Sequence, residues 1–179
     1  MALRVIGIDD GSKEQLVRDC GAEHFIDVTK HDDKSIAEEV VKVAGGLGAS
    51  AVIVCVGSNK AYAQALDFLR YNGTVVCVGV PEGEPQPIAN SYPPGIIFKQ
   101  ATITGSAVGN RTEAIECLDF AARGIVKTHY RVEKMENLTD VSYSLSLIKD
   151  CGLLTGAYIQ VFHEMKDGKL KGRVVIDLQ

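Results

Sequence analysis

The run AVIVCV at residues 51–56 decides the fold of this 179-residue chain. All six side chains are apolar, and most are β-branched, which favours an extended conformation. A strand that is apolar on both faces is typical of a parallel sheet covered by helices on each side. We therefore expect residues 51–56 to form a buried, central strand.

Strand-like and helix-like segments alternate on both sides of this run. Strands are expected at 3–8, 24–28, 74–80, 101–104, 128–132 and 173–178, and helices between Ser12 and Gly21, between Ser35 and Gly45, around 62–69 and at 110–122. The pairs Ser12 with Gln15 and Ser35 with Glu38 predict capping boxes. Residues 81–95 hold all five prolines and are expected to form an irregular loop. The alternation predicts a doubly wound α/β sheet of the Rossmann type.

Composition narrows the function classes. Apolar residues make up 46% and charged residues 23% of the chain, which suits a soluble globular protein with one core. A net charge of −4 argues against nucleic-acid and anionic-membrane partners. The sequence contains no apolar run near the ~20 residues of a membrane span, and we see no signal peptide.

The five cysteines form no CxxC pair, and the four histidines have no companion ligands at zinc-binding spacing. We expect free, mostly buried thiols in a reducing compartment, hence a cytoplasmic location. We expect no metal site built wholly within this chain.

Asp9 is the principal candidate for ligand binding, because ligands of such sheets bind at the carboxyl ends of strands. An acid ending the first strand can accept hydrogen bonds from both ribose hydroxyls of a dinucleotide and repel a 2′-phosphate, which favours NAD over NADP. The alternative is a simple turn-forming residue in Asp9-Asp10-Gly11. Lys13 could reach the same ribose or be a solvated charge. The glycine-rich phosphate loop expected ~20 residues earlier is missing, and the GGLG run at 45–48 opens a strand rather than a helix.

Five runs, taken in order, carry a family resemblance: GID at 7–9, VGVP at 78–81, GSAVGNR at 105–111, ARGIVK at 122–127 and GRVVID at 172–177. Together they resemble the coenzyme half of fungal, zinc-dependent medium-chain alcohol dehydrogenases. The resemblance covers residues 3–140 and 161–179.

This resemblance implies roles for nine residues in binding NAD. Asp9 would bind the adenosine ribose with Lys13 beside it, and Arg173 would pair with the pyrophosphate. Val56 and Ser58 would flank the cofactor, and Val78 and Val80 would present backbone groups to the nicotinamide carboxamide. Ser106 and Val108 would lie along the nicotinamide side. Read without the resemblance, the four valines are strand core and Arg173 is a surface charge.

In the family, a zinc ion polarises the alcohol oxygen and permits hydride transfer to NAD. The resemblance places its ligands and the proton relay before the region matched here, so we assign no catalytic residue and no metal ligand. We interpret the chain as a fragment, with Met1 an internal methionine of a longer parent. Residues 1–136 would be a truncated dinucleotide-binding domain, and 137–179 the family's C-terminal helix and strand.

The fragment interpretation predicts an incomplete sheet. The first strand of the fold and its glycine-rich loop would be absent, and that strand is central in the order 3-2-1-4-5-6. Its two neighbours, beginning at Leu3 and Ala51, would face a gap, and would either close up or leave the chain partly unfolded.

Residues 141–160 have no counterpart in the family. Codons for Val141-Ser142-Tyr143 can contain a splice donor, and Gln160 can be encoded by CAG, so we interpret the segment as a retained intron. A genuine loop insertion is the alternative.

Our functional hypothesis is a fragment of an NAD-dependent enzyme that oxidises a primary alcohol to an aldehyde, inactive as an isolated chain. Family members form homo-oligomers, and a second hypothesis is a non-catalytic association module using residues 103–108. A methyltransferase and a zinc-free quinone or enoyl reductase are the two remaining candidates.

Overall fold

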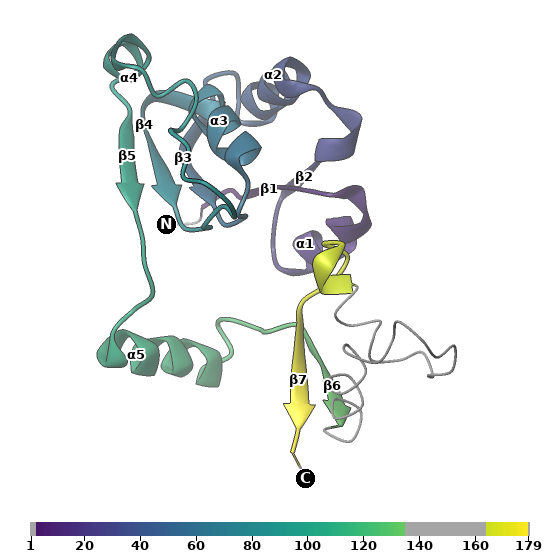
Figure 1. Cartoon of the computed structure of the whole chain (residues 1–179). Coiled ribbons are helices and arrows are strands. Elements are labelled where there is room, and N and C mark those ends of the chain that lie inside the picture. Colours follow the sequence, from purple (N-terminus) through teal and green to yellow (C-terminus); the bar gives the residue numbers. More distant parts are fainter. Residues whose placement is uncertain (1–2, 135–163, 179) are drawn as a thin grey trace, which may run out of the picture. The chain divides into compact units, whose positions relative to one another are not determined.

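The structure is a computed structural model that describes residues 3–134 and 164–178 (Figure 1). The chain divides into two units, Met1–Ala114 and Ile115–Gln179, and the division falls within one helix. The strands pair in parallel in both units. The predicted α/β class with parallel strands is confirmed.

The elements of the first unit are β1 (Ile6–Asp9), η1 (Gly11–Lys13), α1 (Glu14–Asp19), β2 (His24–Asp27), η2 (Val28–Lys30), α2 (Asp33–Val43), β3 (Ala49–Val54), α3 (Asn59–Phe68), β4 (Leu69–Cys77), α4 (Pro93–Lys99) and β5 (Thr102–Gly105). Helix α5 (Arg111–Ala122) crosses the division, and β6 (Tyr130–Lys134) and β7 (Arg173–Asp177) belong to the second unit.

The first unit holds two sheets. One pairs β1 with β2, so that Asp9 lies opposite Asp27 at the carboxyl end. The other has the order β3-β4-β5, with Val54, Cys77 and Gly105 aligned across it. Because each strand is followed by a helix that returns the chain, all pairing is parallel and the carboxyl ends within each sheet share one edge.

Two apolar clusters form the core of this unit. One joins β3 and β4 to α3 through Val54, Tyr62, Ala65, Leu66, Leu69 and Val75. The other joins β2, α2 and the end of α3 through Ile26, Ile36, Val40 and Phe68, with Ile6 and Ile8 of β1 and Val52 of β3 packed against it. Val52 contacts both clusters, so it links the two sheets through their cores.

Strand β3 differs from the expectation of a buried, central strand. It is an edge strand of its sheet, and Ile53 is 63% exposed. Only the face with Val52 and Val54 packs on the core. The apolar run was correctly assigned to a strand, but burial on both faces was wrong because no helix in the described part of this unit covers the second face.

The thiols also depart from expectation. Cys20, Cys55 and Cys117 are exposed and Cys77 is half-buried, all four of them free. Cys55 follows β3 directly, beyond the strand's last core residue, Val54. The expected burial was therefore wrong for three thiols; Cys151 lies outside the described residues.

Several element boundaries also differ. Asp10 caps η1 and Asp32 caps α2, in place of the expected Ser12 and Ser35, and Ser35 instead completes a capping box with Asp32. Asn72 adopts φ 56° inside β4, where the register with β3 shifts, so β4 begins well before the expected residue 74 and contains an irregularity. Pro93 begins α4 rather than continuing the loop, since proline is favoured in a first helical turn.

In the second unit β6 pairs in parallel with β7, and the Arg173 N–H donates to the His129 carbonyl at 2.9 Å. A Cβ on Gly172 would lie 2.3 Å from that carbonyl oxygen, so the close approach of the two strands requires glycine. The segment 141–160 and the predicted start at residue 137 lie outside the described residues. None of the helices in the described ranges is long and apolar enough to cross a membrane.

Candidate functional site

Asp9 ends β1 with its side chain partly exposed. Its Oδ1 accepts a hydrogen bond from the Asp10 N–H at 2.7 Å and lies 3.3 Å from the Lys13 Nζ. The structure therefore brings the two predicted ribose-binding residues together. A carboxylate held in this way keeps acceptor positions for two neighbouring hydroxyls, beside a positive charge.

The loop after Asp9 is shaped by a second carboxylate at the end of β2. Asp27 Oδ1 accepts the Gly11 N–H at 3.1 Å, the Thr29 N–H at 2.9 Å and the Thr29 hydroxyl at 2.7 Å. Its Oδ2 forms an ion pair with Lys30 at 3.2 Å. The hydrogen bonds from Thr29, followed by the Lys30 charge, lower the pKa of Asp27 to about 2. This side chain is only 11% exposed. Because of its low pKa, it is ionised at neutral pH.

Gly11 fits this arrangement because it has no side chain. A Cβ there would lie 2.2 Å from Asp27 Oδ2, closer than any real contact. Asp10 completes the loop, since its Oδ1 accepts the Ser12 N–H at 2.9 Å and caps η1. The hydrogen bonds to Ser12 lower the pKa of Asp10.

Asp27 is the site residue that the sequence analysis missed. A usable signal was present, because Asp27 ends the strand that pairs with the first strand and is followed two residues later by Thr29. In neighbouring parallel strands, such terminal carboxylates meet at one edge. Asp27 acts on the site through Gly11, and its role is to position the Asp9 loop.

Val56 and Ser58 follow the end of β3. The Ser58 Oγ accepts the Ala61 N–H at 3.4 Å and caps α3, which begins at the next residue. The Val56 carbonyl accepts the Ser58 N–H at 2.9 Å, so the two residues form one tight turn. Val56 is exposed, not part of a strand core.

Val78 and Val80 follow the end of β4, beside that turn. The N–H groups of Val78 and Gly79 both donate to the Val54 carbonyl, at 3.1 and 2.8 Å. A Cβ on Gly57 would lie 2.5 Å from the Val80 carbonyl oxygen. The backbones after β3 and β4 thus approach closely, and the Val78 and Val80 side chains are both exposed.

Ser106 and Val108 follow β5 on the same sheet edge. The Ser106 N–H donates to the Cys77 carbonyl at 2.9 Å, and Val108 is 98% exposed. The structure therefore groups six predicted residues at the carboxyl edge of the three-stranded sheet, with Asp9 and Lys13 at that of the two-stranded sheet. Arg173 belongs to the second unit, where it is exposed on β7.

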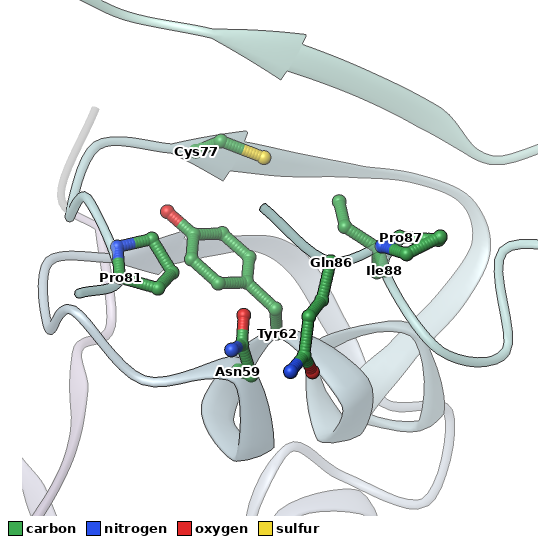
Figure 2. A pocket seen from close by; sticks show the side chains of 7 residues that line it. All are labelled: Asn59, Tyr62, Cys77, Pro81, Gln86, Pro87 and Ile88. Atoms are coloured by element: carbon green, nitrogen blue, oxygen red, sulfur yellow. The ribbon is translucent and has the colours of Figure 1, made fainter. Parts of the chain in front are cut away.

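A cavity of about 150 Å³ opens next to this edge (Figure 2). Its lining consists of Asn59, Tyr62, Cys77, Pro81, Gln86, Pro87 and Ile88. The Tyr62 ring lies among these side chains, and its hydroxyl donates to the Gly79 carbonyl at 2.5 Å. Burial raises the pKa of Tyr62. The cavity is smaller than the ~300–1,000 Å³ of typical ligand sites, and none of the nine predicted residues lines it.

No group of three or more His, Cys, Asp or Glu side chains within residues 3–134 and 164–178 could hold a metal ion. The residues in these two ranges therefore do not fit a catalytic zinc, which needs three protein ligands.

Comparison with known proteins agrees with this architecture. The model of the zinc-binding dehydrogenase family matches residues 1–123. The chain belongs to this family. Its similarity to the medium-chain alcohol dehydrogenases, which five short runs of the sequence indicated, is confirmed, and the methyltransferase hypothesis is wrong.

Among curated relatives, alcohol dehydrogenase 2 of Emericella nidulans is 55% identical over 99% of this chain and 44% of the relative. An alcohol dehydrogenase of Schizosaccharomyces pombe is 35% identical, again over 99% of this chain and 44% of the relative. The chain thus spans less than half the length of these relatives.

Among solved structures, the alcohol dehydrogenase of the archaeon Aeropyrum pernix is similar with a TM-score of 0.72 and 22% identity, over 97% of this chain and 42% of that one. A second structure, of an NAD-dependent alcohol dehydrogenase, gives a TM-score of 0.73 at 18% identity, over 98% of this chain and 44% of that one. At these identities the likeness establishes the fold.

Proposed function

We propose that this chain binds NAD as the coenzyme-binding part of a zinc-type alcohol dehydrogenase, with the Asp9 carboxylate on the adenosine ribose. The arrangement of Asp9 and Lys13 supports this proposal, because the Asp9 Oδ1 and the Lys13 Nζ lie 3.3 Å apart. The loop that carries them is positioned by the hydrogen bond from Gly11 to Asp27. A carboxylate that receives ribose hydroxyls repels a 2′-phosphate, so NAD is preferred over NADP.

The remaining contacts are proposed from the family resemblance. Val56 and Ser58 would flank the cofactor, Val78 and Val80 would present backbone groups to the nicotinamide carboxamide, and Ser106 and Val108 would lie along the nicotinamide. Their positions after the ends of β3, β4 and β5 suit this role, because ligands of open α/β sheets bind at that edge. Arg173 would pair with the pyrophosphate.

The reaction of the whole enzyme is, on this proposal, hydride transfer from a small primary alcohol to NAD in the cytoplasm. None of the described residues is assigned to the chemical step, so the chain alone would bind without turnover. The purified chain mixed with zinc, NAD and ethanol should give no rise in absorbance at 340 nm. Formation of NADH would contradict this part of the proposal.

Cofactor preference can be tested separately from turnover. In saturation-transfer NMR, the adenine and ribose protons of NAD should receive more magnetisation from the chain than those of NADP. Asp9→Asn should reduce this difference, because the neutral amide no longer repels the 2′-phosphate. Asp19→Asn, on the exposed end of α1, is the matched control. An unchanged preference in Asp9→Asn would contradict the assignment of Asp9.

A second candidate is a non-catalytic association module, favoured by the sheet edge at β5. Within the part of the chain that the structure describes, β5 pairs only with β4, which leaves its outer edge open from Ile103 onward. Native mass spectrometry of the chain at several concentrations would test this function. A monomer at all concentrations would contradict it.

A further inference from the structure

Tyr62 joins helix α3 to the turn that follows β4. Its hydroxyl donates to the Gly79 carbonyl at 2.5 Å, and Figure 2 shows its ring extending from α3 towards the segment between Cys77 and Pro81. The residue is 6% exposed, so water competes little for this hydrogen bond. Burial also raises the pKa of the phenol, which therefore keeps its proton and remains a donor at neutral pH.

Hydrogen bonds on both sides of Gly79 fix the two peptide planes that meet there. The Gly79 N–H donates to the last carbonyl of β3 at 2.8 Å, which fixes the plane shared with Val78. The Gly79 carbonyl accepts the Tyr62 hydroxyl, which fixes the plane shared with Val80. A Cβ on Gly79 would lie 2.4 Å from the Val56 carbonyl oxygen, so the turn also lies directly against the backbone after β3. Of these constraints, only the Tyr62 bond comes from a side chain.

The same geometry leaves one backbone acceptor and one backbone donor available to a ligand. In a trans peptide the C=O and the N–H point in opposite directions, and no peptide bond in the described residues is cis. The Val78 carbonyl therefore points away from β3, and the Val80 N–H points away from Tyr62. Within residues 3–134 and 164–178, neither of these two groups has a hydrogen-bond partner.

We propose that Tyr62 is a positioning residue for the nicotinamide end of NAD. This inference rests on the proposed function, in which Val78 and Val80 present backbone groups to the nicotinamide carboxamide. A carboxamide combines an NH₂ donor with a carbonyl acceptor, and these complement the Val78 carbonyl and the Val80 N–H. Tyr62 holds the peptide between Gly79 and Val80 in the orientation that offers this N–H. Without the hydroxyl this peptide can rotate, and the donor is no longer preorganised.

Tyr62 also contributes to the apolar core, and the two roles can be separated by substitution. Its ring belongs to the cluster of Val54, Ala65, Leu66, Leu69 and Val75. Tyr62→Phe keeps the ring in this cluster and removes only the hydroxyl. Tyr71→Phe is the matched control, because Tyr71 lies on β4, is 73% exposed and has no hydrogen-bond partner for its hydroxyl among the described residues.

Saturation-transfer NMR of NAD reports the two ends of the cofactor separately. Tyr62→Phe should reduce the signal of the nicotinamide protons, relative to that of the adenine protons, by a factor of roughly three or more, because the carboxamide loses a fixed donor. The adenine signal should persist, since the Asp9 loop is unchanged. Tyr71→Phe should keep the ratio of the unmodified chain. A purely structural role for Tyr62 would lower both signals together.

Restoring the donor should restore the nicotinamide signal. The unnatural residue 4-aminophenylalanine, placed at position 62, keeps the ring and carries an amino group that can donate to the Gly79 carbonyl. We expect it to return the ratio of nicotinamide to adenine signal to that of the unmodified chain. This rescue depends on the hydrogen bond and not on the volume of the ring.

Hydrogen exchange tests the anchoring of the turn without cofactor. In Tyr62→Phe the Gly79 N–H should exchange faster by a factor of roughly three or more, because the turn has lost one of its constraints. The Val75 N–H, in the core of the sheet, should keep its protection and so report that the variant is folded. Tyr71→Phe should leave the exchange of both groups unchanged.

The proposal would be overturned by an unchanged ratio of nicotinamide to adenine signal in Tyr62→Phe, or by equal loss of both signals. Unchanged exchange at Gly79, or a ratio that 4-aminophenylalanine does not restore, would also overturn it. If no proton of NAD receives magnetisation from the unmodified chain, the proposed function fails and this inference fails with it. If adenine binds and the nicotinamide signal does not depend on Tyr62, the inference alone fails.

Discussion

The two sheets of the first unit are stabilised in different ways. In the three-stranded sheet, β4 is flanked on both sides and Val75 is 1% exposed, packed with Leu66, Ala65 and Tyr62 of α3. In the two-stranded sheet only Ile26 is buried, at 3% exposed. Its carboxyl end is instead organised by Asp27, which binds Gly11, Thr29 and Lys30.

This difference separates stability from cofactor recognition. Apolar packing in the three-stranded sheet contributes free energy that is insensitive to pH, whereas the Asp9 loop depends on hydrogen bonds to one carboxylate. The proposed ribose site thus lies on the sheet with the smaller core. Substitutions should therefore divide into those that unfold the unit and those that disturb the loop.

The largest expected effect is on the three-stranded sheet. Leu66→Ala removes a side chain buried against β3 and β4, and should lower the free energy of unfolding by about 2–5 kcal/mol. Leu47→Ala is the matched control, because Leu47 is 74% exposed and its truncation should cost less than about 0.5 kcal/mol. Urea denaturation followed by circular dichroism measures both. Equal losses would contradict the assigned core.

Gly11→Ala should have the next largest effect, on the two-stranded sheet. The new methyl group would overlap Asp27 Oδ2 and force the loop to shift, at a cost of about 1–3 kcal/mol. Gly105→Ala controls for the loss of glycine, since a Cβ there meets no heavy atom within 4 Å. Hydrogen exchange of the N–H groups at positions 11 and 29 should accelerate only in Gly11→Ala. Similar exchange in both variants would show that the contact does not shape the loop.

The fold was predictable because runs of β-branched residues and helical spacing are local signals. The runs at 24–28, 51–56 and 74–80 each overlap a strand of the structure, β2, β3 and β4, and extend a few residues past its end. Exposure was not predictable in the same way. An apolar run such as Ala51–Val56 indicates that both faces can be covered, whereas coverage depends on elements far away in the sequence. Ile53 is exposed for this reason.

In the candidate site, too, residues with a local signal were predicted and those that depend on strand pairing were not. Asp9 was found because it ends a strand before a turn, and Lys13 because it follows in the first helical turn. Asp27 was missed because, although it ends a strand as Asp9 does, its importance arises from the pairing that places it opposite Asp9 across the sheet. The nine predicted contacts with NAD stay predictions, although the structure groups eight of them at strand ends.

A smaller effect is expected in the pH dependence of stability, to which Asp27 of the two-stranded sheet contributes. Because the pKa of Asp27 is lowered from 3.8 to about 2 in the folded state, its stabilisation is complete well above pH 3.8 and is lost as the pH falls towards 2. Between pH 5 and 2, the melting temperature of Asp27→Asn should therefore fall less steeply than that of the unmodified chain. Asp19→Asn, on the exposed end of α1, should retain the original slope. Parallel curves for all three proteins would contradict the role of Asp27.

The smallest effect is expected at the opposite end of the two-stranded sheet. Arg4 forms a two-pronged ion pair with Glu23, with the Nε and Nη2 each 2.9 Å from a carboxylate oxygen, just before β1 and β2 begin. Both side chains are largely exposed, so solvent and salt weaken their attraction. Glu23→Gln should shift the melting temperature by at most roughly 2 °C, and less in high salt. A larger, salt-sensitive shift would mean that charged pairs stabilise both ends of this sheet. It would contradict the contrast between an organised carboxyl end and a weakly stabilised amino end.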